Sequence, residues 1–199
     1  MSNLAQKFEK GHIDKPKWEM IDGVIVMMSP RPKRNHTEVT QQIFRIFDRH
    51  LWGKKCRVYM ENMLVTLTRD DRFVPDIAII CDTNILKDDG AHGAPDLIVE
   101  VLSFSTSRYD KGHKKKIYGK AGVKEYWIVD TKNRTIEVYL NNDGIMELDE
   151  IYTAIPERDM EAMSDEDKAK FTFDFKTSLF DDLVINVYEV FQEIVEEVY

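Results

Sequence analysis

Two acidic residues interrupt apolar stretches that are typical of buried β-strands. Glu100 lies in the middle of DLIVEVLS, residues 96–103, and Asp76 precedes the apolar residues 77–81. An ionised carboxylate in a protein interior is costly unless a partner compensates its charge. Two neighbouring carboxylates also repel each other, and a shared divalent cation removes that repulsion. We therefore expect Asp76 and Glu100 to be catalytic residues that bind Mg²⁺, with Mn²⁺ as a substitute.

Lys114 is the third candidate catalytic residue, in a helix expected over residues 109–121. It precedes Ile117 and Tyr118 by three and four residues, so it shares the apolar side of that helix. A lysine stem can lie along apolar surface and carry its ammonium to a site at the end of a sheet. In the alternative, Lys114 turns outward and neutralises Asp110.

Two carboxylates, a lysine and a divalent metal together suit the hydrolysis of phosphodiester bonds. The metal polarises the phosphoryl group and lowers the pKa of a bound water, while the lysine offsets the charge that develops. Simpler explanations stay open: Asp76 could cap a backbone amide at a strand edge, and Glu100 could pair with a buried basic residue. All three residues could also form a buried ion network without a catalytic role.

Weaker candidates accompany this set. His36 begins a predicted helix and could reach the metal, although a packed, hydrogen-bonded histidine is the more ordinary explanation. Glu61 interrupts a strand and could be either an outer metal ligand or a surface-facing residue. Contacts with DNA phosphates are expected from basic and hydroxyl side chains that follow the Glu100 strand, namely Ser103, Arg108, Lys111 and Lys115.

The elements that must position these residues alternate between strand and helix patterns. Asp22-Gly23 is a tight-turn signal in a hairpin over residues 18–28, and Asn35 can cap a helix from His36 to about Trp52. Strands are expected over residues 57–67, 73–81, 96–103, 123–130 and 135–140, and an amphipathic helix is expected from Leu183. This order predicts an α/β fold with a mixed central sheet, an N-terminal β-hairpin and a C-terminal helix.

Composition and charge are typical of a globular protein, and one domain is expected over residues 1–199. Of the 28 basic and 36 acidic residues, 4 basic and 17 acidic residues lie after residue 140, so residues 141–199 carry −13 and the preceding part carries +5. We expect this acidic extension to pack on the domain. The basic body keeps DNA available as a partner despite the overall charge of −8.

Several classes of protein are disfavoured. No apolar run approaches the ~20 residues of a membrane helix, and the first residues contain no signal core, so a cytoplasmic location and no membrane partner are expected. Two cysteines are too few and too far apart for a disulfide framework or a zinc site. The sequence also lacks a phosphate-binding glycine loop, an HExxH motif and a nucleophile elbow.

Many of these residues match a known family. The chain resembles the PD-(D/E)XK nuclease superfamily and, more closely, the restriction endonuclease-like family called Uma-two. The resemblance is carried by WEMIDG (18–23), Ser29-Pro30, His36, VPDIA (74–78), DLIVEVLS, Asp110 with Lys114 and Tyr118, AGVKEYWIVD (121–130) and Ser178-Leu179-Phe180. It implies a restriction endonuclease-like core of a helix, three strands, a helix and a strand.

The resemblance also bears on individual residues. The superfamily lysine is expected two residues after the glutamate, where this chain has Leu102, so the resemblance implies that Lys114 has taken over its role. Glu19 lies in the opening motif of the family and is a further candidate for an outer metal ligand.

These observations favour a Mg²⁺-dependent endodeoxyribonuclease. We expect it to recognise DNA structure or to have modest sequence specificity, because the chain contains no helix-turn-helix and no zinc finger. The alternative is a catalytically silent module on the same fold that binds nucleic acid or protein, which the acidic charge favours. The terminal helix could cover the core of this domain or of a second copy, so a homodimer is a further expectation.

Overall fold

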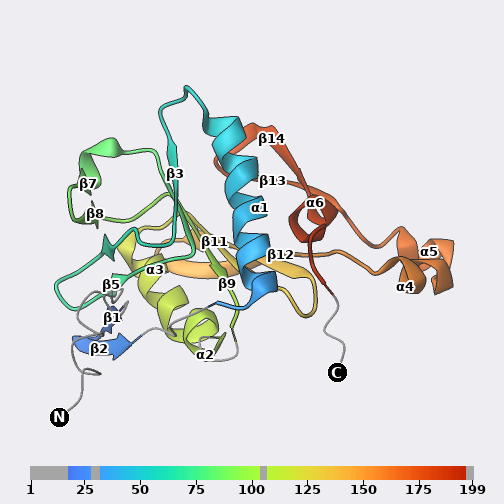
Figure 1. The fold of residues 1–199 in the computed structure, drawn as a ribbon, viewed down its shortest axis with the longest axis horizontal. Helices are drawn as coiled ribbons and strands as arrows, with labels where there is room; N and C mark the ends of the chain where they lie inside the picture. Colours follow the sequence, from blue (N-terminus) through green and yellow to red (C-terminus); the bar gives the residue numbers. More distant parts are fainter. Residues whose placement is uncertain (1–17, 28–31, 104–106, 196–199) are drawn as a thin grey trace, which may run out of the picture.

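Residues 18–27, 32–103 and 107–195 are described by the computed structural model of the chain (Figure 1). Its centre is a six-stranded mixed sheet in the order β12-β11-β10-β9-β6-β3, in which β9 and β10 are parallel and the other neighbours antiparallel. The strands are β3 (Arg57–Met60), β6 (Ile77–Ile80), β9 (Leu97–Val101), β10 (Glu125–Asp130), β11 (Thr135–Asn142) and β12 (Ile145–Thr153).

A broken helix connects β9 to β10, because parallel neighbours require a crossover connection. It consists of α2 (Ser107–Tyr109), a π-helical turn η3 (Asp110–Lys114) and α3 (Lys115–Ala121). Gly122 ends α3 with a φ of 95°, a conformation that favours a residue without Cβ. The helix predicted over residues 109–121 is confirmed, and the π turn is a feature that the sequence pattern did not indicate.

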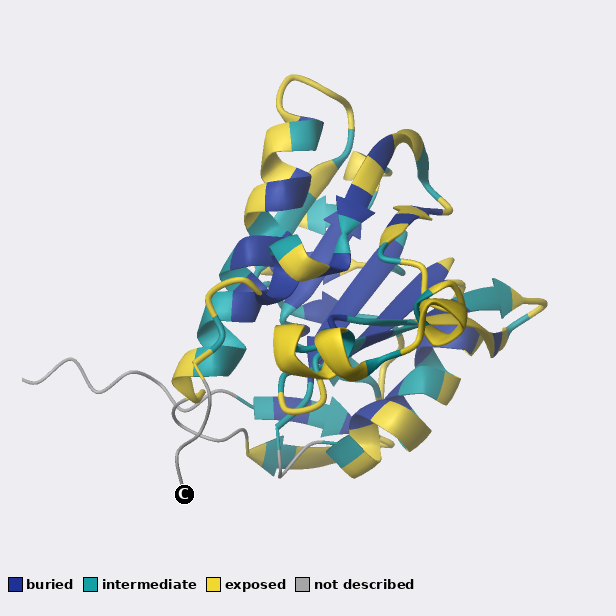
Figure 2. Cartoon of the chain, turned by 90° about the vertical axis from the view of Figure 1, so that its right-hand side faces the viewer, coloured by how far each residue is buried: buried dark blue, intermediate teal, exposed yellow. Residues whose placement is uncertain are grey.

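Apolar layers cover both faces of the central sheet. On one face, Phe47 of α1 (Arg34–Leu51) packs on Trp127 with ring centroids 5.6 Å apart. On the other face, Tyr118 of α3 packs edge-on against Tyr126 at 5.2 Å. Figure 2 shows the resulting core, with buried strands between helices whose outer sides are exposed. Because both faces of β9 are covered, Glu100 in this strand is buried, with 4% of its surface exposed.

The start of α1 differs from the prediction. Lys33 occupies the N-cap position, and Asn35 lies in the first turn. The Asn35 amide instead binds the backbone of Val195, since Nδ2 donates to its carbonyl at 2.9 Å and Oδ1 accepts its N–H at 3.2 Å. The predicted Asn35 cap was wrong because this side chain fixes a segment from the other end of the chain.

A second, smaller sheet carries the N-terminal hairpin. Its order is β2-β1-β5-β4-β8-β7. Asp22 and Gly23 connect its first two strands and have φ angles of 50° and 77°, as a two-residue hairpin turn requires, so the predicted hairpin is confirmed. The bounds are β1 (Trp18–Ile21), β2 (Val24–Met27), β4 (Val65–Thr66), β5 (Arg72–Phe73), β7 (Leu86–Lys87) and β8 (Gly90–His92), with a 3₁₀ turn η2 (Thr83–Ile85) before β7.

Two predicted strands are each split between the sheets. The stretch 57–67 forms β3 and β4, separated at Asn62, whose φ is 84°. The stretch 73–81 gives its first residue to β5 and forms β6 only after Pro75, which cannot donate a ladder hydrogen bond. Both breaks come directly beside candidate acids, so Glu61 and Asp76 lie just outside regular strands.

The two cysteines are joined, although their spacing does not predict it. Cys56 precedes β3, Cys81 follows β6, and the two form a disulfide across 25 residues. The antiparallel register of Arg57 with Ile80 places the cysteines opposite each other. The disulfide therefore closes one end of the β3–β6 ladder.

The last third of the chain was only partly predicted. A helix from Leu183 was wrong, because Leu183 and Ile185 alternate inward from β14 (Phe180–Asn186), which pairs with β13 (Asp174–Thr177). The helix α6 (Val187–Phe191) begins only afterwards, capped by the Asn186 side chain. Val198, assigned to the same helix, lies outside the described residues.

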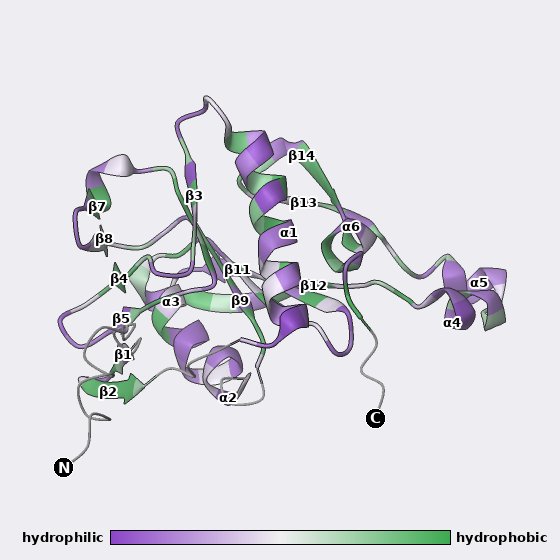
Figure 3. Ribbon diagram, viewed as in Figure 1, coloured by the Kyte–Doolittle hydropathy of each residue, from purple (hydrophilic) through white to green (hydrophobic). Residues whose placement is uncertain are grey.

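Two short, hydrophilic helices precede this hairpin. They are α4 (Glu157–Ala162) and α5 (Asp165–Lys168), and they lie at the end of the molecule opposite β1 and β2 (Figure 3). In the described part of the chain, none of the helices is both long and apolar enough to cross a membrane.

Candidate functional site

Lys114 lies inside the protein among three carboxylates. Its Nζ is 3.0 Å from Oε1 of Glu19, 3.1 Å from Oε1 of Glu100 and 3.4 Å from Oδ1 of Asp110. The lysine side chain is 3% exposed, and none of the three acids exceeds 6%. The inward orientation predicted from helical spacing is confirmed, although Asp110 turns inward with the lysine.

Neighbouring groups hold this cluster in place. The hydroxyl of Tyr118 donates to Oε1 of Glu100 at 2.9 Å, and Oε1 of Glu19 also accepts the N–H of Val74 at 3.1 Å. The π turn carries Asp110 and Lys114, and the hydroxyl of Tyr126 donates to the Asp110 carbonyl at 3.1 Å. A π turn frees backbone groups for such bonds and is frequent at functional sites.

The charges in the cluster do not balance, since three carboxylates face one ammonium. Burial raises the pKa of Glu100 well above its ordinary value, and Asp110, Asp76 and Glu19 add to this against the opposing charge of Lys114. Burial also disfavours the charged lysine, but the surrounding carboxylates outweigh it and raise the Lys114 pKa. Lys114 is therefore a fixed cation rather than a base, and the excess negative charge suits an additional proton or metal ion.

Asp76 combines two of the roles considered for it. Its Oδ2 accepts the N–H of Val101 at 2.7 Å, so it does cap a backbone amide at the end of the β6–β9 ladder. Because Val101 follows Glu100 directly, Asp76 also lies close enough for its charge to raise the Glu100 pKa. The same Oδ2 is 3.2 Å from Nε2 of His36.

His36, Glu61 and Asp76 form a group that could hold a metal ion. One ligand atom from each lies within 4.8 Å of the others, and among the described residues no further group of this kind was found. Burial lowers the His36 pKa. The hydrogen bond to Asp76 and the negative charges of Asp76 and Glu61 together raise it by more, so the His36 pKa lies above its ordinary value. This ligand set places Asp76 with His36 and Glu61, whereas Glu100 faces Lys114.

The residues expected to contact DNA phosphates have different surroundings. Lys111 pairs with Glu137 of β11 at 2.5 Å. The Nζ of Lys115 lies 4.2 Å from the centroid of the Tyr139 ring, also on β11. Arg108 on α2 is exposed, and Ser103, which follows β9, is half-buried. Of the three basic residues, Arg108 has the charge most available to a partner.

Glu125 is a buried acid that the sequence analysis did not single out. Its Oε1 accepts the Trp127 indole N–H at 2.6 Å, and its Oε2 accepts the backbone N–H and the hydroxyl of Ser178 at 2.7 and 2.6 Å. These bonds fasten the β13–β14 hairpin to the central sheet. The available signal was an acid within VKEYWIVD, the same anomaly that marked Glu100.

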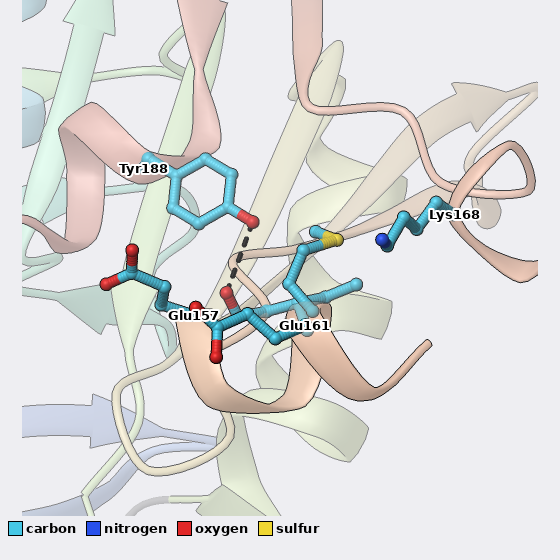
Figure 4. A pocket seen from close by; sticks show the side chains of 6 residues that line it. Glu157, Glu161, Lys168 and Tyr188 are labelled. Carbon is cyan, nitrogen blue, oxygen red and sulfur yellow. Dashed lines mark hydrogen bonds between the residues drawn. The ribbon is translucent and has the colours of Figure 1, made fainter. Parts of the chain in front are cut away.

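A surface pocket lies away from this site. It has a volume of about 400 Å³ and lies between α4, α5 and α6 (Figure 4). The Tyr188 hydroxyl beside it donates to the Ile155 carbonyl at 3.2 Å. Its remaining lining comes from Glu157, Met160, Glu161 and Lys168. None of the candidate catalytic or metal-binding residues lines this pocket.

Known proteins resemble the chain in sequence. The family model Uma2, or Uma-two, described as “Putative restriction endonuclease”, matches residues 5–166. “Uncharacterized protein slr1290” of Synechocystis sp. is 30% identical over 129 residues, which are 64% of this chain and 67% of that protein. “Uncharacterized protein sll1609” of the same organism is 25% identical over 127 residues, covering 62% and 71%.

A solved structure resembles the fold. It is the crystal structure of “a putative nuclease belonging to DUF820” from Anabaena variabilis, with a TM-score of 0.67 and 20% identity over 89% of this chain and 90% of that one. The similarity confirms the α/β, restriction endonuclease-like architecture expected from the sequence.

Proposed function

The chain belongs to the Uma2 family, and from this premise we propose that it is a metal-dependent endonuclease that hydrolyses phosphodiester bonds in DNA. The observation that carries the proposal is the burial of Lys114 against Glu100, with Asp76 at the adjoining strand end. Two acids and a lysine on these elements are the set that the sequence predicted for this chemistry.

The residues fit a divalent cation because three carboxylates surround one ammonium, and the charge of Asp76 adds to the raised pKa of Glu100. We assign Mg²⁺, with Mn²⁺ as a substitute, to Asp76 and Glu100, and outer support to His36, Glu61 and Glu19. When bound, the metal would polarise the phosphoryl group and lower the pKa of a water.

The chain's own groups have separate tasks. Lys114 stays charged and offsets the negative charge that develops on the phosphoryl oxygens. Tyr118 and Glu19 hold Glu100 and Lys114 at fixed positions. The side chains of Asp76 and His36 are 14% and 12% exposed, more than those of Lys114, Glu100 and Glu19, so the scissile phosphate is expected to approach from their side. Arg108, Lys111, Lys115 and Ser103 are the proposed contacts to the DNA backbone.

A cleavage assay tests this assignment. Wild-type protein with Mg²⁺ or Mn²⁺ should nick supercoiled plasmid, and EDTA should stop it. Asp76→Asn, Glu100→Gln and Lys114→Met should each lower the rate by roughly 100-fold or more, as for the loss of one transition-state contact. Lys120→Met is the matched control, because Lys120 lies exposed on the same helix. A wild-type protein that cleaves neither supercoiled, linear nor single-stranded DNA with either metal would contradict the proposal.

The near-complete burial of the Lys114 cluster favours a second candidate, a catalytically silent module that binds nucleic acid or protein. In that case the cluster is a structural ion network. Such a module should bind labelled DNA or a protein partner equally well with EDTA or Mg²⁺. Its melting temperature should also not rise with either metal, whereas a working metal site stabilises the folded state by mass action.

A further inference from the structure

We propose that His36, Glu61 and Asp76 form a mixed nitrogen–oxygen centre that selects a divalent transition-metal ion, with Mn²⁺ as the probe, over Mg²⁺. The inference rests on the proposed metal-dependent function and specifies its cofactor. It revises the metal assignment of that function: Asp76 stays a ligand, His36 and Glu61 become direct ligands in place of outer support, and Mn²⁺ rather than Mg²⁺ becomes the preferred ion.

Three elements that are distant in sequence bring these ligands together. The β3–β6 register pairs Met60 with Ile77, so the next residues, Glu61 and Asp76, emerge at the same end of the ladder. His36 reaches that end from the first turns of α1. The three ligand atoms lie within 4.8 Å of one another. Opposite ligands of an ion with ~2.1 Å bonds are ~4.2 Å apart, so a small movement of the side chains would bring all three to one ion.

His36 and Asp76 already have a separation that suits two ligands of one ion. Nε2 of His36 and Oδ2 of Asp76 are 3.2 Å apart. Two adjacent ligands at ~2.1 Å from an octahedral ion are ~3.0 Å apart, so a cation can replace the direct contact with little movement. The N–H of Val101 donates to Asp76 and holds its carboxylate in place, as groups behind metal ligands commonly do.

The donor atoms decide the class of metal. Mg²⁺ prefers oxygen ligands and retains several waters, whereas imidazole nitrogen suits transition-metal ions. The imidazole therefore disfavours Mg²⁺, the two carboxylates suit Mn²⁺, and the affinity of such a mixed site rises from Mn²⁺ to the heavier first-row ions. The side chains of His36 and Asp76 are 12% and 14% exposed, which gives an ion access that the Lys114 cluster lacks.

Binding of the metal itself, without DNA, tests the inference. Protein stripped with EDTA is titrated with Mn²⁺ by electron paramagnetic resonance, and Mg²⁺ is added as a competitor. We expect Mn²⁺ to bind at least tenfold more tightly than Mg²⁺, and pulsed measurements on the wild-type complex to show coupling to a ¹⁴N nucleus. His36→Gln should abolish this coupling and weaken Mn²⁺ binding by at least about 10- to 100-fold, the loss that follows even when only a group behind a ligand is removed.

His50→Gln is the matched control, because His50 lies near the other end of α1 beside Asp182. It should keep both the coupling and the affinity. Absence of nitrogen coupling in the wild-type complex, or equal affinities for the two metals, would overturn the inference. Both measurements use the wild-type protein, so they do not depend on the folding of a variant. If the protein cleaves DNA but shows no nitrogen coupling, the proposed function holds and the His36 metal centre is wrong. If it shows the coupling but does not cleave DNA, the metal centre holds and the proposed function is wrong.

Discussion

At the scale of single residues, the unbalanced charge around Lys114 makes this lysine essential for stability. Lys114→Met leaves Glu19, Glu100 and Asp110 buried without a cation, which should cost about 3–5 kcal/mol of unfolding free energy. Glu100→Gln removes one of three like charges and should cost much less. Urea unfolding in EDTA measures both, and Lys120→Met should have almost no effect. A larger loss for Glu100→Gln than for Lys114→Met would contradict this account of the cluster.

Because the pKa of Glu100 is raised, the difference in unfolding free energy between wild-type protein and Glu100→Gln should depend on pH. A carboxyl group whose pKa is raised on folding contributes most stability below its ordinary value of 4.5, and this contribution is lost as the pH rises through the folded pKa. Wild-type protein should therefore lose stability relative to Glu100→Gln as the pH increases from about 4.5. Unfolding free energies at a series of pH values measure this. A difference that is independent of pH would show that Glu100 ionises freely in the folded protein.

At the scale of elements, the Glu125–Ser178 contact connects the terminal hairpin to the central sheet. Glu125 accepts three hydrogen bonds, so Glu125→Gln replaces an acceptor with a donor and should cost about 1–3 kcal/mol. Ser178→Ala removes one donor and should cost about 1 kcal/mol. The double variant should lose less than the sum, because the two changes share a bond. Additive losses in urea unfolding would mean that Ser178 and Glu125 act independently.

The same elements show what the sequence could predict. Apolar runs in β9 and β10, helical spacing in α1 and α3 and the Asp22-Gly23 turn are local signals, and each was correctly interpreted. The position of Lys114 followed from its spacing to Ile117 and Tyr118. The β13–β14 hairpin was missed because Leu183 and Ile185 alternate over too few residues to stand out against the helical pattern of Val187 and Val190.

The grouping of metal ligands was harder to predict for a different reason. His36, Glu61 and Asp76 lie on separate segments, and only the β3–β6 register and the packing of α1 bring them together. The disulfide at the other end of that ladder was missed for the same reason. Contacts between distant segments depend on pairing register, which the local pattern of one sequence does not specify.

At the scale of the whole molecule, charge is distributed unevenly. The acidic helices α4 and α5 lie at one end, opposite β1 and β2 (Figure 1). Several exposed basic residues belong instead to α2, η3 and α3, the segment that also carries Lys114. Lys111 is paired with Glu137, so it contributes little net charge to a partner, whereas Lys115 lies over the Tyr139 ring and keeps its charge. A nucleic acid should therefore make fewer phosphate contacts here than the number of basic residues suggests.

Arg108 should provide one of these contacts. Binding of labelled duplex DNA in EDTA, measured over a range of salt concentrations, should weaken in Arg108→Gln for every sequence tested. The slope of log affinity against log salt should decrease by ~0.9, the value for one lost phosphate contact. Arg158→Gln is the matched control, because Arg158 is equally a surface arginine but lies in the acidic helix α4 beside Asp159. An unchanged slope in Arg108→Gln, or an equal change in both variants, would mean that DNA does not bind across α2.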